Sequence, residues 1–177
     1  MTVTPLQLAN MMAAVANGGK LYRPYLVSRV ESLDGATVRE YGAELIRSID
    51  MKPETLSRVH KALADVVHGP GGTGGAARSP AIPVAGKTGT AQVIEMKGAY
   101  LKSEQLSYFN RDHAWFVSYA PVEKPRVAIA VLVEHGGHGG AAAAPLAKRV
   151  YEESVEVQEA AAENKREARA GGQSRAN

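Results

Sequence analysis

The pattern of apolar and polar positions near the start of the chain predicts a helix. Thr4 stands where an N-cap residue is expected, Pro5 takes the first helical position, and Gln7 is placed to complete a capping box. Apolar residues then recur on one face at helical spacing. Asn17-Gly18-Gly19 predicts the end of this helix, because these residues tolerate positive φ.

A second helix is predicted from about residue 53 to residue 67. Five apolar residues form a stripe of the width that is typical of a surface helix: Leu56, Val59, Leu63, Val66 and Val67. His60 and His68 flank this stripe. Single histidines in such positions are more often structural than ligands, so we assign them no chemistry.

The last periodic stretch predicts a helix from about residue 141 to residue 162. Four large apolar side chains are expected to face a sheet: Leu146, Val150, Tyr151 and Val157. The following residues are charged, rich in alanine and interrupted by glycine. We therefore expect a domain over residues 1–162 and a disordered charged tail over residues 163–177.

Extended patterns predict the strands. Asp34-Gly35 is a turn signal between two stretches of strand-like residues, 26–30 and 37–41, and predicts a small peripheral β-hairpin. Residues 113–120 and 127–133 predict two strands with apolar residues on both alternate faces, which is typical of a sheet covered on both sides. The predicted fold class is α/β (α+β), with an antiparallel sheet packed between helices.

Composition narrows the class of protein. Of the 177 residues, 45% are hydrophobic and 22% are charged, which is typical of a soluble globular domain. The net charge of +3 is spread along the chain, so nucleic acid is not an expected partner. Cysteine is absent, which excludes disulfides and thiolate metal sites. No apolar run approaches the roughly 20 residues of a membrane span, and no membrane segment is expected.

The most informative chemistry lies in the stretch Pro83–Val93. Its flanks have strand character, and its middle, Gly86-Lys87-Thr88-Gly89-Thr90, carries one cation, two hydroxyls and two glycines. Glycine in a strand often marks a place where a ligand or another backbone approaches closely. The stretch therefore predicts an edge strand on which Lys87 and Thr88 line a cleft.

Two nucleotide-binding motifs match this region only in part. Gly86-Lys87-Thr88 also ends a phosphate-binding loop, but Ala81 stands where that motif needs glycine, and strand-like residues follow where it needs a helix. Residues 69–74 match G-x-G-x-x-G, but they follow a helix, whereas the dinucleotide fingerprint follows a strand. Neither match predicts a nucleotide site, and no cofactor is expected.

Glu134, His135 and His138 suggest a metal site at first sight. Zinc sites need three or four ligands with a fixed surrounding shell, and four glycines and no further ligand stand close by in the sequence. No metal is therefore expected. The polar connection 98–112 is long enough to rim a cleft, and a disordered connection is the alternative.

The Lys-Thr-Gly stretch and several distant segments together resemble a known family. Lys87-Thr88-Gly89 is one of three short motifs of the active-site serine penicillin-recognising enzymes, alongside Ser-x-x-Lys and Ser-x-Asn. Five further segments match: Val3–Ala9, Ala16–Gly19, His113–Phe116, Ala120-Pro121 and Ala143–Pro145. Together they resemble the latter part of a class B penicillin-binding protein of the elongation type.

This resemblance implies a D,D-transpeptidase that cross-links peptidoglycan stem peptides and is trapped by β-lactams. It implies that Lys87 supplies positive potential to the cleft and that Thr88 binds the carboxylate of the substrate or the β-lactam. It also implies that the backbone N–H of Thr90 donates to the oxyanion and that Gly89 lets the acyl group lie against the strand. The implied location is the periplasmic face of the bacterial inner membrane.

The chain departs from the family in one decisive respect. None of its serines has lysine three residues later or asparagine two residues later, so both the nucleophile motif and the Ser-x-Asn motif are missing. We expect a C-terminal part of a transpeptidase domain, without the first two strands of the sheet and with the upstream half of the protein as its partner. The alternative is a noncatalytic remnant or binding module, so the chain alone leaves open whether it is an enzyme. Because the family's first strand lies beside the strand at 127–133, we expect that strand to be partly unpaired.

Overall fold

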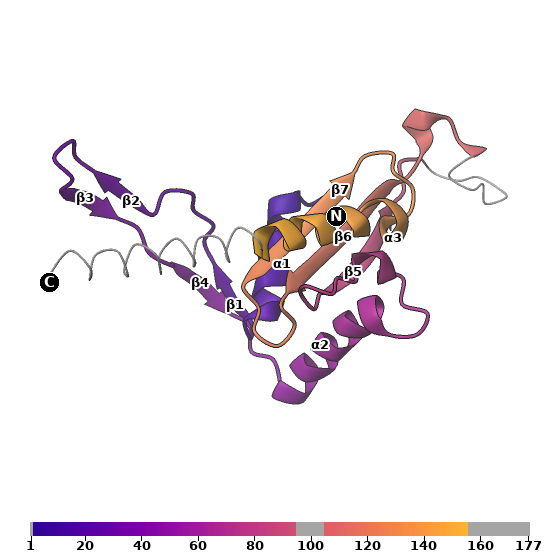
Figure 1. Cartoon of the computed structure of the whole chain (residues 1–177), viewed down its shortest axis with the longest axis horizontal. Coiled ribbons are helices and arrows are strands. Elements are labelled where there is room, and N and C mark those ends of the chain that lie inside the picture. The colour runs from indigo at the N-terminus through magenta and orange to yellow at the C-terminus, as the bar shows by residue number, and fades with distance from the viewer. Residues whose placement is uncertain (1, 95–104, 156–177) are drawn as a thin grey trace, which may run out of the picture.

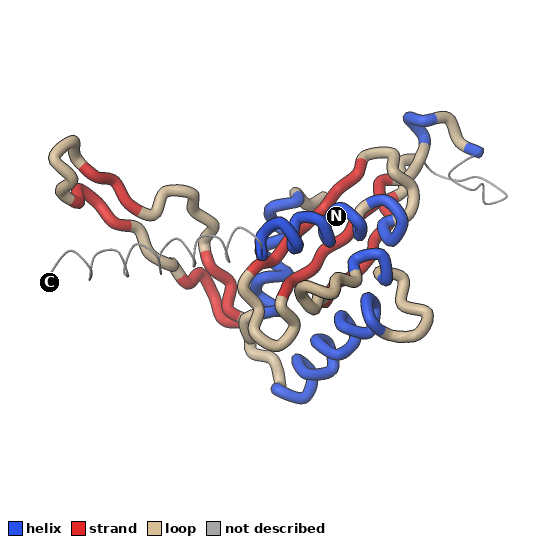
Figure 2. The backbone as a smooth tube through the Cα atoms, viewed as in Figure 1, coloured by secondary structure: helices blue, strands red, loops and turns tan. Residues whose placement is uncertain are grey.

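The structure is a computed structural model that describes residues 2–94 and 105–155. A three-stranded sheet with helices on both faces forms the body, and a ribbon of paired strands extends from it as an arm (Figure 1). Figure 2 shows the same division, with the helices gathered around the body and the arm made of strands and loops. The α/β fold class with an antiparallel sheet is confirmed.

The body is built on strands β5 (Ala85–Ala91), β6 (His113–Ala120) and β7 (Val127–Val133), in the order β5-β6-β7 with antiparallel pairing. Lys87 lies opposite Val117, and Gly89 lies opposite Trp115. In the described part of the chain β5 and β7 are the two edges of this sheet, as the sequence predicts.

Helix α1 (Pro5–Ala16) begins and ends where the sequence predicts. The capping box is present: the Gln7 backbone N–H donates to the Thr4 hydroxyl over 3.2 Å, and the Thr4 backbone N–H donates to the Gln7 side-chain oxygen over 2.8 Å. Gly18 and Gly19 both have positive φ, 86° and 92°, directly after the Asn17 C-cap. The local signals therefore suffice to set both ends of this helix.

Helix α2 (Pro53–His68) lies beside α1 and strand β5. Its two histidines hydrogen-bond to the backbone of neighbouring segments. The ring Nε2 of His60 lies 2.8 Å from the carbonyl oxygen of Val15 at the end of α1. The ring Nε2 of His68 lies 3.0 Å from the carbonyl oxygen of Val84, next to β5. Both histidines donate to backbone carbonyls, which agrees with their structural interpretation.

The C-terminal helical part differs from the prediction. A short helix α3 (Gly139–Ala142) ends at Ala143, and residues 144–155 continue as helix. The buried face consists of Ala143, Ala144, Ala147 and Tyr151, all fully buried.

Leu146 and Val150, in contrast, are 43% and 50% exposed, so the prediction that they face the sheet was wrong. The alanines contribute to the same buried cluster as the large ring of Phe116, because small residues let the helix approach the sheet closely. Val157, the end of the predicted domain at residue 162 and the predicted tail 163–177 lie outside the described residues.

The arm contains two pairs of antiparallel strands. Strand β2 (Arg29–Glu31) pairs with β3 (Thr37–Glu40), which confirms the predicted hairpin around Asp34-Gly35. Strand β1 (Lys20–Tyr22) pairs with β4 (Leu45–Ser48), and this pairing was not predicted. Strands β2, β3 and β4 contain only exposed residues.

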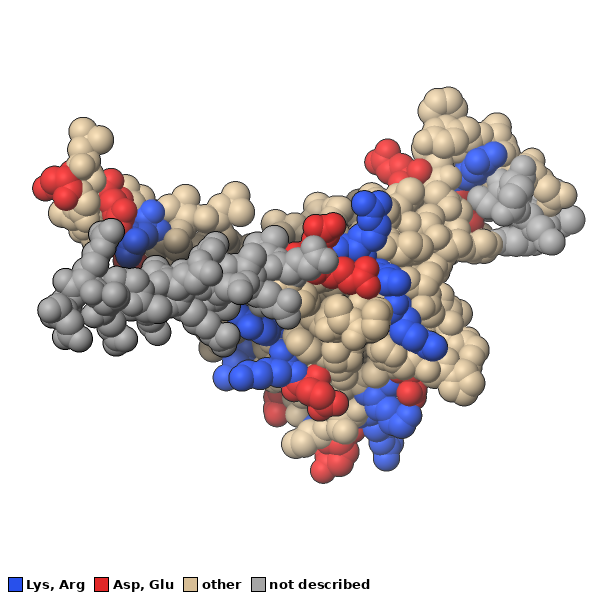
Figure 3. Space-filling view, in the orientation of Figure 1, with Lys and Arg blue, Asp and Glu red and all other residues tan. Residues whose placement is uncertain are grey.

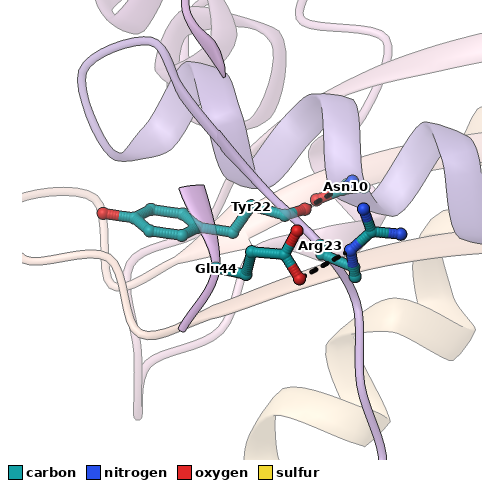
Figure 4. Close-up of polar contacts among 4 residues, drawn as sticks. All are labelled: Asn10, Tyr22, Arg23 and Glu44. Carbon is teal, nitrogen blue, oxygen red and sulfur yellow. Dashed lines mark hydrogen bonds and ion pairs between the residues drawn. The ribbon is translucent and has the colours of Figure 1, made fainter. Parts of the chain in front are cut away.

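Polar contacts fix the root of the arm to the body (Figure 4). The side-chain amide of Asn10 in α1 donates to the carbonyl oxygen of Tyr22 over 3.1 Å. Beside it, the Arg23 guanidinium pairs with the Glu44 carboxylate at 2.8 Å across the ribbon. The side chains of this pair are more than half exposed, so it orients the ribbon and adds little stability.

The two faces of the sheet are buried to different extents. On the face toward the C-terminal helix, four alternate residues of β6 are fully buried: Ala114, Phe116, Ser118 and Ala120. On the face toward α1 and α2, Tyr119 is fully buried, but His113, Trp115 and Val117 are only half-buried. The predicted cover on both sides is therefore complete on one face only.

Acidic and basic side chains are interspersed on the face of the molecule that Figure 3 shows, without a field of one sign. Among the described helices, none is long and apolar enough to cross a membrane.

Candidate functional site

Strand β5 forms the floor of a cleft with a volume of about 520 Å³. The four residues predicted from the Lys-Thr-Gly stretch all line it: Lys87, Thr88, Gly89 and Thr90. The other lining residues come from the loop after α2 and from the start of α3, with the α3 N-cap His138: Thr73, His138, Gly139, Gly140 and Ala141. The structure thus brings together the predicted residues and adds a second wall that the sequence analysis did not assign.

Neighbouring residues of β5 project to opposite faces of the sheet. Thr88 and Thr90 pair with Phe116 and Ala114 and therefore share the face of the C-terminal helix. Lys87 shares the other, half-open face, where its partner is Val117. Because β5 is an edge strand, the cleft reaches both the cation and the hydroxyls.

The ammonium group of Lys87 donates a hydrogen bond to the carbonyl oxygen of Thr88 over 2.7 Å. The side chain of Lys87 is exposed, and no aspartate or glutamate is among the residues that line the cleft. Lys87 therefore gives this cleft a net positive potential.

Thr73 is a functional candidate that the sequence analysis missed. Its hydroxyl oxygen lies 2.8 Å from the hydroxyl oxygen of Thr88, so the two side chains are hydrogen-bonded across the cleft. The loop that carries Thr73 is anchored to the end of α2, where the backbone N–H of Gly74 donates to the carbonyl oxygen of Val66 over 2.9 Å. The available signal was that Thr73 is the single polar side chain within the glycine run 71–75.

Two glycines at the start of α3 form the second wall of the cleft and pack closely against their neighbours. A Cβ atom on Gly139 would lie 2.1 Å from the carbonyl oxygen of Trp115 and 2.5 Å from that of Gly89. A Cβ atom on Gly140 would lie 2.2 Å from the carbonyl oxygen of Thr73. A larger residue would push the wall away from the sheet at Gly139 and away from the Thr73 loop at Gly140, so both glycines are needed for the cleft to have this shape.

The cleft contains three threonine hydroxyls but no activated nucleophile. Activation needs a base in hydrogen-bond contact, and no threonine that lines the cleft has a hydrogen bond to a histidine or carboxylate in the described part of the chain. The arrangement of one cation and three hydroxyls instead suits the binding of a small anion with hydrogen-bond acceptors, such as a carboxylate.

His135, one of the residues weighed as metal ligands, makes other contacts. The ring Nδ1 of His135 lies 3.1 Å from the carbonyl oxygen of Arg111, and the ring itself packs against His113. Within residues 2–94 and 105–155, no group of three or more histidine, cysteine, aspartate or glutamate side chains is placed to hold a metal ion. Residues 98–104 of the polar connection 98–112, which was weighed as a rim of the cleft, lie outside the described residues.

Comparison with known proteins identifies the family. A sequence profile described as "Penicillin binding protein transpeptidase domain" matches residues 1–152. The chain is 40% identical over 152 residues to "Peptidoglycan D,D-transpeptidase MrdA" of Acinetobacter baumannii, covering 85% of this chain and 22% of that protein. It is 36% identical over 155 residues to MrdA of Haemophilus influenzae, covering 85% of this chain and 23% of that protein. The chain thus spans less than a quarter of the length of these two curated relatives.

Solved structures have the same fold. The D,D-transpeptidase domain of a peptidoglycan glycosyltransferase from Eggerthella lenta superposes with a TM-score of 0.70 at 35% identity, covering 88% of this chain and 33% of that chain. Penicillin-binding protein 2 of Pseudomonas aeruginosa, solved with WCK 5153, superposes with a TM-score of 0.63 at 37% identity, covering 86% and 29%. Penicillin-binding protein A of M. tuberculosis, solved as an imipenem acyl-enzyme, superposes with a TM-score of 0.66 at 29% identity, covering 86% and 31%. The chain therefore belongs to the family of penicillin-binding protein transpeptidase domains.

Proposed function

We propose that this chain forms the Lys-Thr-Gly wall of a peptidoglycan D,D-transpeptidase of the MrdA type, and that the serine nucleophile lies in a segment outside these 177 residues. One observation carries the proposal: Lys87, Thr88 and Thr90 line a single cleft that has a cation and no carboxylate. Acyl transfer needs such a wall, because the substrate presents a carboxylate and the transition state develops a second negative charge.

Thr88 is proposed to bind the carboxylate of the D-alanyl substrate or of a β-lactam. A hydroxyl can donate one proton only, so Thr88 can donate to a ligand only if it accepts from Thr73. The 2.8 Å contact between the two hydroxyls supports this assignment: the Thr73 hydroxyl donates to Thr88, and the Thr88 hydroxyl donates a hydrogen bond to the carboxylate. Thr73 is then a positioning residue for Thr88.

Lys87 is proposed to raise the positive potential of the cleft and to hydrogen-bond beside the nucleophile. Its contact with the Thr88 carbonyl oxygen uses one of the three protons of the ammonium group. The other two protons remain for further acceptors, and Lys87 shares its face of the sheet with Trp115 and Val117, which are incompletely covered. That face is the proposed docking place for the upstream half of the protein.

Thr90 and Gly89 are proposed to serve the reacting acyl group. The backbone N–H of Thr90 would donate to the oxyanion, and one such donor contributes roughly 3 kcal/mol of transition-state stabilisation. Gly89 has no side chain to block the approach of the acyl group. Gly139 packs closely against the backbone of Gly89 and Trp115.

The biological setting is part of the same proposal. Stem peptides and β-lactams are the proposed ligands, because relatives are described as peptidoglycan D,D-transpeptidases and solved as β-lactam acyl-enzymes. Cell-wall elongation at the periplasmic face of the inner membrane is the proposed setting, with the upstream half of the protein as partner. A noncatalytic binding module is the alternative, and the experiment below decides between the two.

The test is labelling by a fluorescent penicillin. Joining the segment of Acinetobacter MrdA that precedes its aligned region to the start of this chain should give a protein that labels, because the serine is restored. Lys87→Ala in that fusion should reduce the labelling rate at least a hundredfold, whereas Lys124→Ala, an exposed lysine between β6 and β7, should leave it unchanged. A folded fusion that does not label, or that labels equally with Lys87→Ala, would favour the noncatalytic module.

A further inference from the structure

Four aromatic side chains gather at the end of the sheet and have no part in the proposed function. They form a surface that we call the aromatic patch: Tyr108, Phe109, His113 and His135. Phe109 is 75% exposed and Tyr108 is 56% exposed, although phenylalanine occurs only twice in the whole chain. Two adjacent exposed rings indicate a recognition surface, because burying them would otherwise be favourable.

The rings contact one another around a fixed centre. The ring centroid of His135 lies 5.1 Å from that of Tyr108, 5.8 Å from that of Phe109 and 4.8 Å from that of His113. His135 adopts a φ of 55°, which is uncommon for a residue with a side chain. Its backbone N–H donates to the Nδ1 atom of His113 over 2.9 Å, and its own Nδ1 lies 3.1 Å from the carbonyl oxygen of Arg111. These bonds fix the two histidine rings at the centre of the patch.

The same bonds settle the roles of the imidazole nitrogens. The Nδ1 atom of His113 accepts a hydrogen bond, so in the neutral ring the proton is on Nε2, which is a donor. The Nδ1 atom of His135 faces a carbonyl oxygen and must donate, so in the neutral ring Nε2 is an acceptor. The patch therefore combines two exposed aromatic rings with one donor and one acceptor in the half-buried histidines.

The patch adjoins the cleft. His113 is the strand partner of Ala91, the residue that follows Thr90 along β5. His135 precedes His138, which lines the cleft, by three positions. Figure 2 shows the short helical turn η3 (Tyr108–Asn110) beyond the end of the sheet, away from the arm. A polymer that has one unit in the cleft can therefore continue over the patch.

We propose that the aromatic patch binds an N-acetylated amino sugar of the glycan strand that carries the substrate peptide. This inference rests on the proposed function for its choice of polymer. A sugar ring has an apolar C–H face that packs on an aromatic ring and a rim of hydroxyl and amide groups that both donate and accept, which matches the two rings and the two imidazole nitrogens. A purely apolar partner would leave the donor and the acceptor unsatisfied.

The test measures retention of the 177-residue chain on immobilised chitotetraose, an oligomer of N-acetylglucosamine, at submicromolar protein concentration. Phe109→Ala should weaken the apparent affinity at least fivefold, and Phe109→Trp should retain it, because the ring face is preserved. The matched control is Tyr25→Ala, which removes a ring that is 50% exposed on the arm. This control should bind like the unchanged chain.

Equal retention of the unchanged chain and Phe109→Ala would overturn the inference, and so would no retention of the unchanged chain. Retention on an immobilised stem peptide that is lost with Phe109→Ala would also overturn it, because the patch would then bind peptide. Penicillin labelling of the fusion is measured separately and needs no sugar. A labelling fusion with a patch that binds no glycan would thus refute this inference alone.

Discussion

The two faces of the β5-β6-β7 sheet differ in how completely their residues are buried. On the face toward the C-terminal helix, the alternate residues of β6 from Ala114 to Ala120 are fully buried. On the opposite face, helices α1 and α2 cover Tyr119, while Trp115 and Val117 stay half-buried beside Lys87. Along β6 the first face is fully buried, although at its β5 edge it also carries the cleft residues Thr88 and Thr90. The second face carries Lys87, the cation of the proposed site.

This difference is the basis of the proposal that the upstream half docks on the less buried face. A buried charged group is costly unless it has partners, and Lys87 on this face is exposed. We call the face toward the C-terminal helix the sealed face and the opposite face the half-open face. We therefore expect substitutions on the two faces to have different effects on stability.

The largest effect is expected from truncating a side chain on the sealed face. Phe116→Ala removes a fully buried ring that lies against Gly86, and should lower the free energy of unfolding by about 3–5 kcal/mol. Val117→Ala, one residue along on the half-open face, should cost no more than about 1 kcal/mol. Urea unfolding of both variants gives the two values, and equal losses would show that the faces are not different.

Two buried tyrosines should respond with opposite signs to loss of the hydroxyl. The hydroxyl of Tyr151, on the sealed side, bonds to that of Ser118 over 3.0 Å, so Tyr151→Phe should cost about 1 kcal/mol. The hydroxyl of Tyr119 is buried on the other face without a hydrogen-bond partner in the described part of the chain, so Tyr119→Phe should be neutral or stabilising by about 1 kcal/mol. Chemical unfolding measures both, and a loss with Tyr119→Phe would mean that its hydroxyl has a partner.

The sealed face should also make the fold sensitive to alkali. Burial raises the pKa of the Tyr151 phenol, and its hydrogen bond with Ser118 offsets this only in part. The folded-state pKa is then above the unfolded value of about 10, so the stabilisation is complete below pH 10 and is lost as the pH rises toward the folded-state pKa. Unfolding free energies measured between pH 8 and pH 11.5 should fall more steeply for the unchanged chain than for Tyr151→Phe. Identical slopes would contradict this assignment.

The smallest effect concerns the half-open face itself. Trp115 is the single tryptophan of the chain, and it is half-buried on that face. Joining the upstream half should cover it, so the emission maximum should shift by a few nanometres to the blue and acrylamide quenching should decrease. Unchanged emission and quenching in a fusion that labels with penicillin would place the upstream half elsewhere.

The short motifs predicted much of this arrangement because their information is local. The capping box at Thr4, the turn at Asp34-Gly35 and the Lys-Thr-Gly strand each depend on a few consecutive residues, and each lies where the sequence predicts. The β1–β4 pairing joins segments more than twenty residues apart through very short strands, so no local signal announces it.

The features that the sequence did not predict depend on tertiary packing. Leu146 and Val150 have the spacing of a core face, but the buried side of that helix is made of alanines that approach Phe116 and the sheet. Thr73 lies 15 positions before Thr88, and only the fold of the glycine loop brings the two hydroxyls together. Such contacts depend on the volumes of distant residues, which a periodic pattern does not encode.

The intact mass of the 177-residue chain after incubation with benzylpenicillin tests most directly whether the serine nucleophile lies outside it. The chain has the proposed anchoring groups Lys87, Thr88 and Thr90 but no serine with lysine three residues later, so we predict an unchanged mass. The same treatment of the fusion with the upstream segment should add the mass of one penicillin on a serine of that segment. A drug-sized increase on the 177-residue chain, mapped to one of its own serines, would contradict the account.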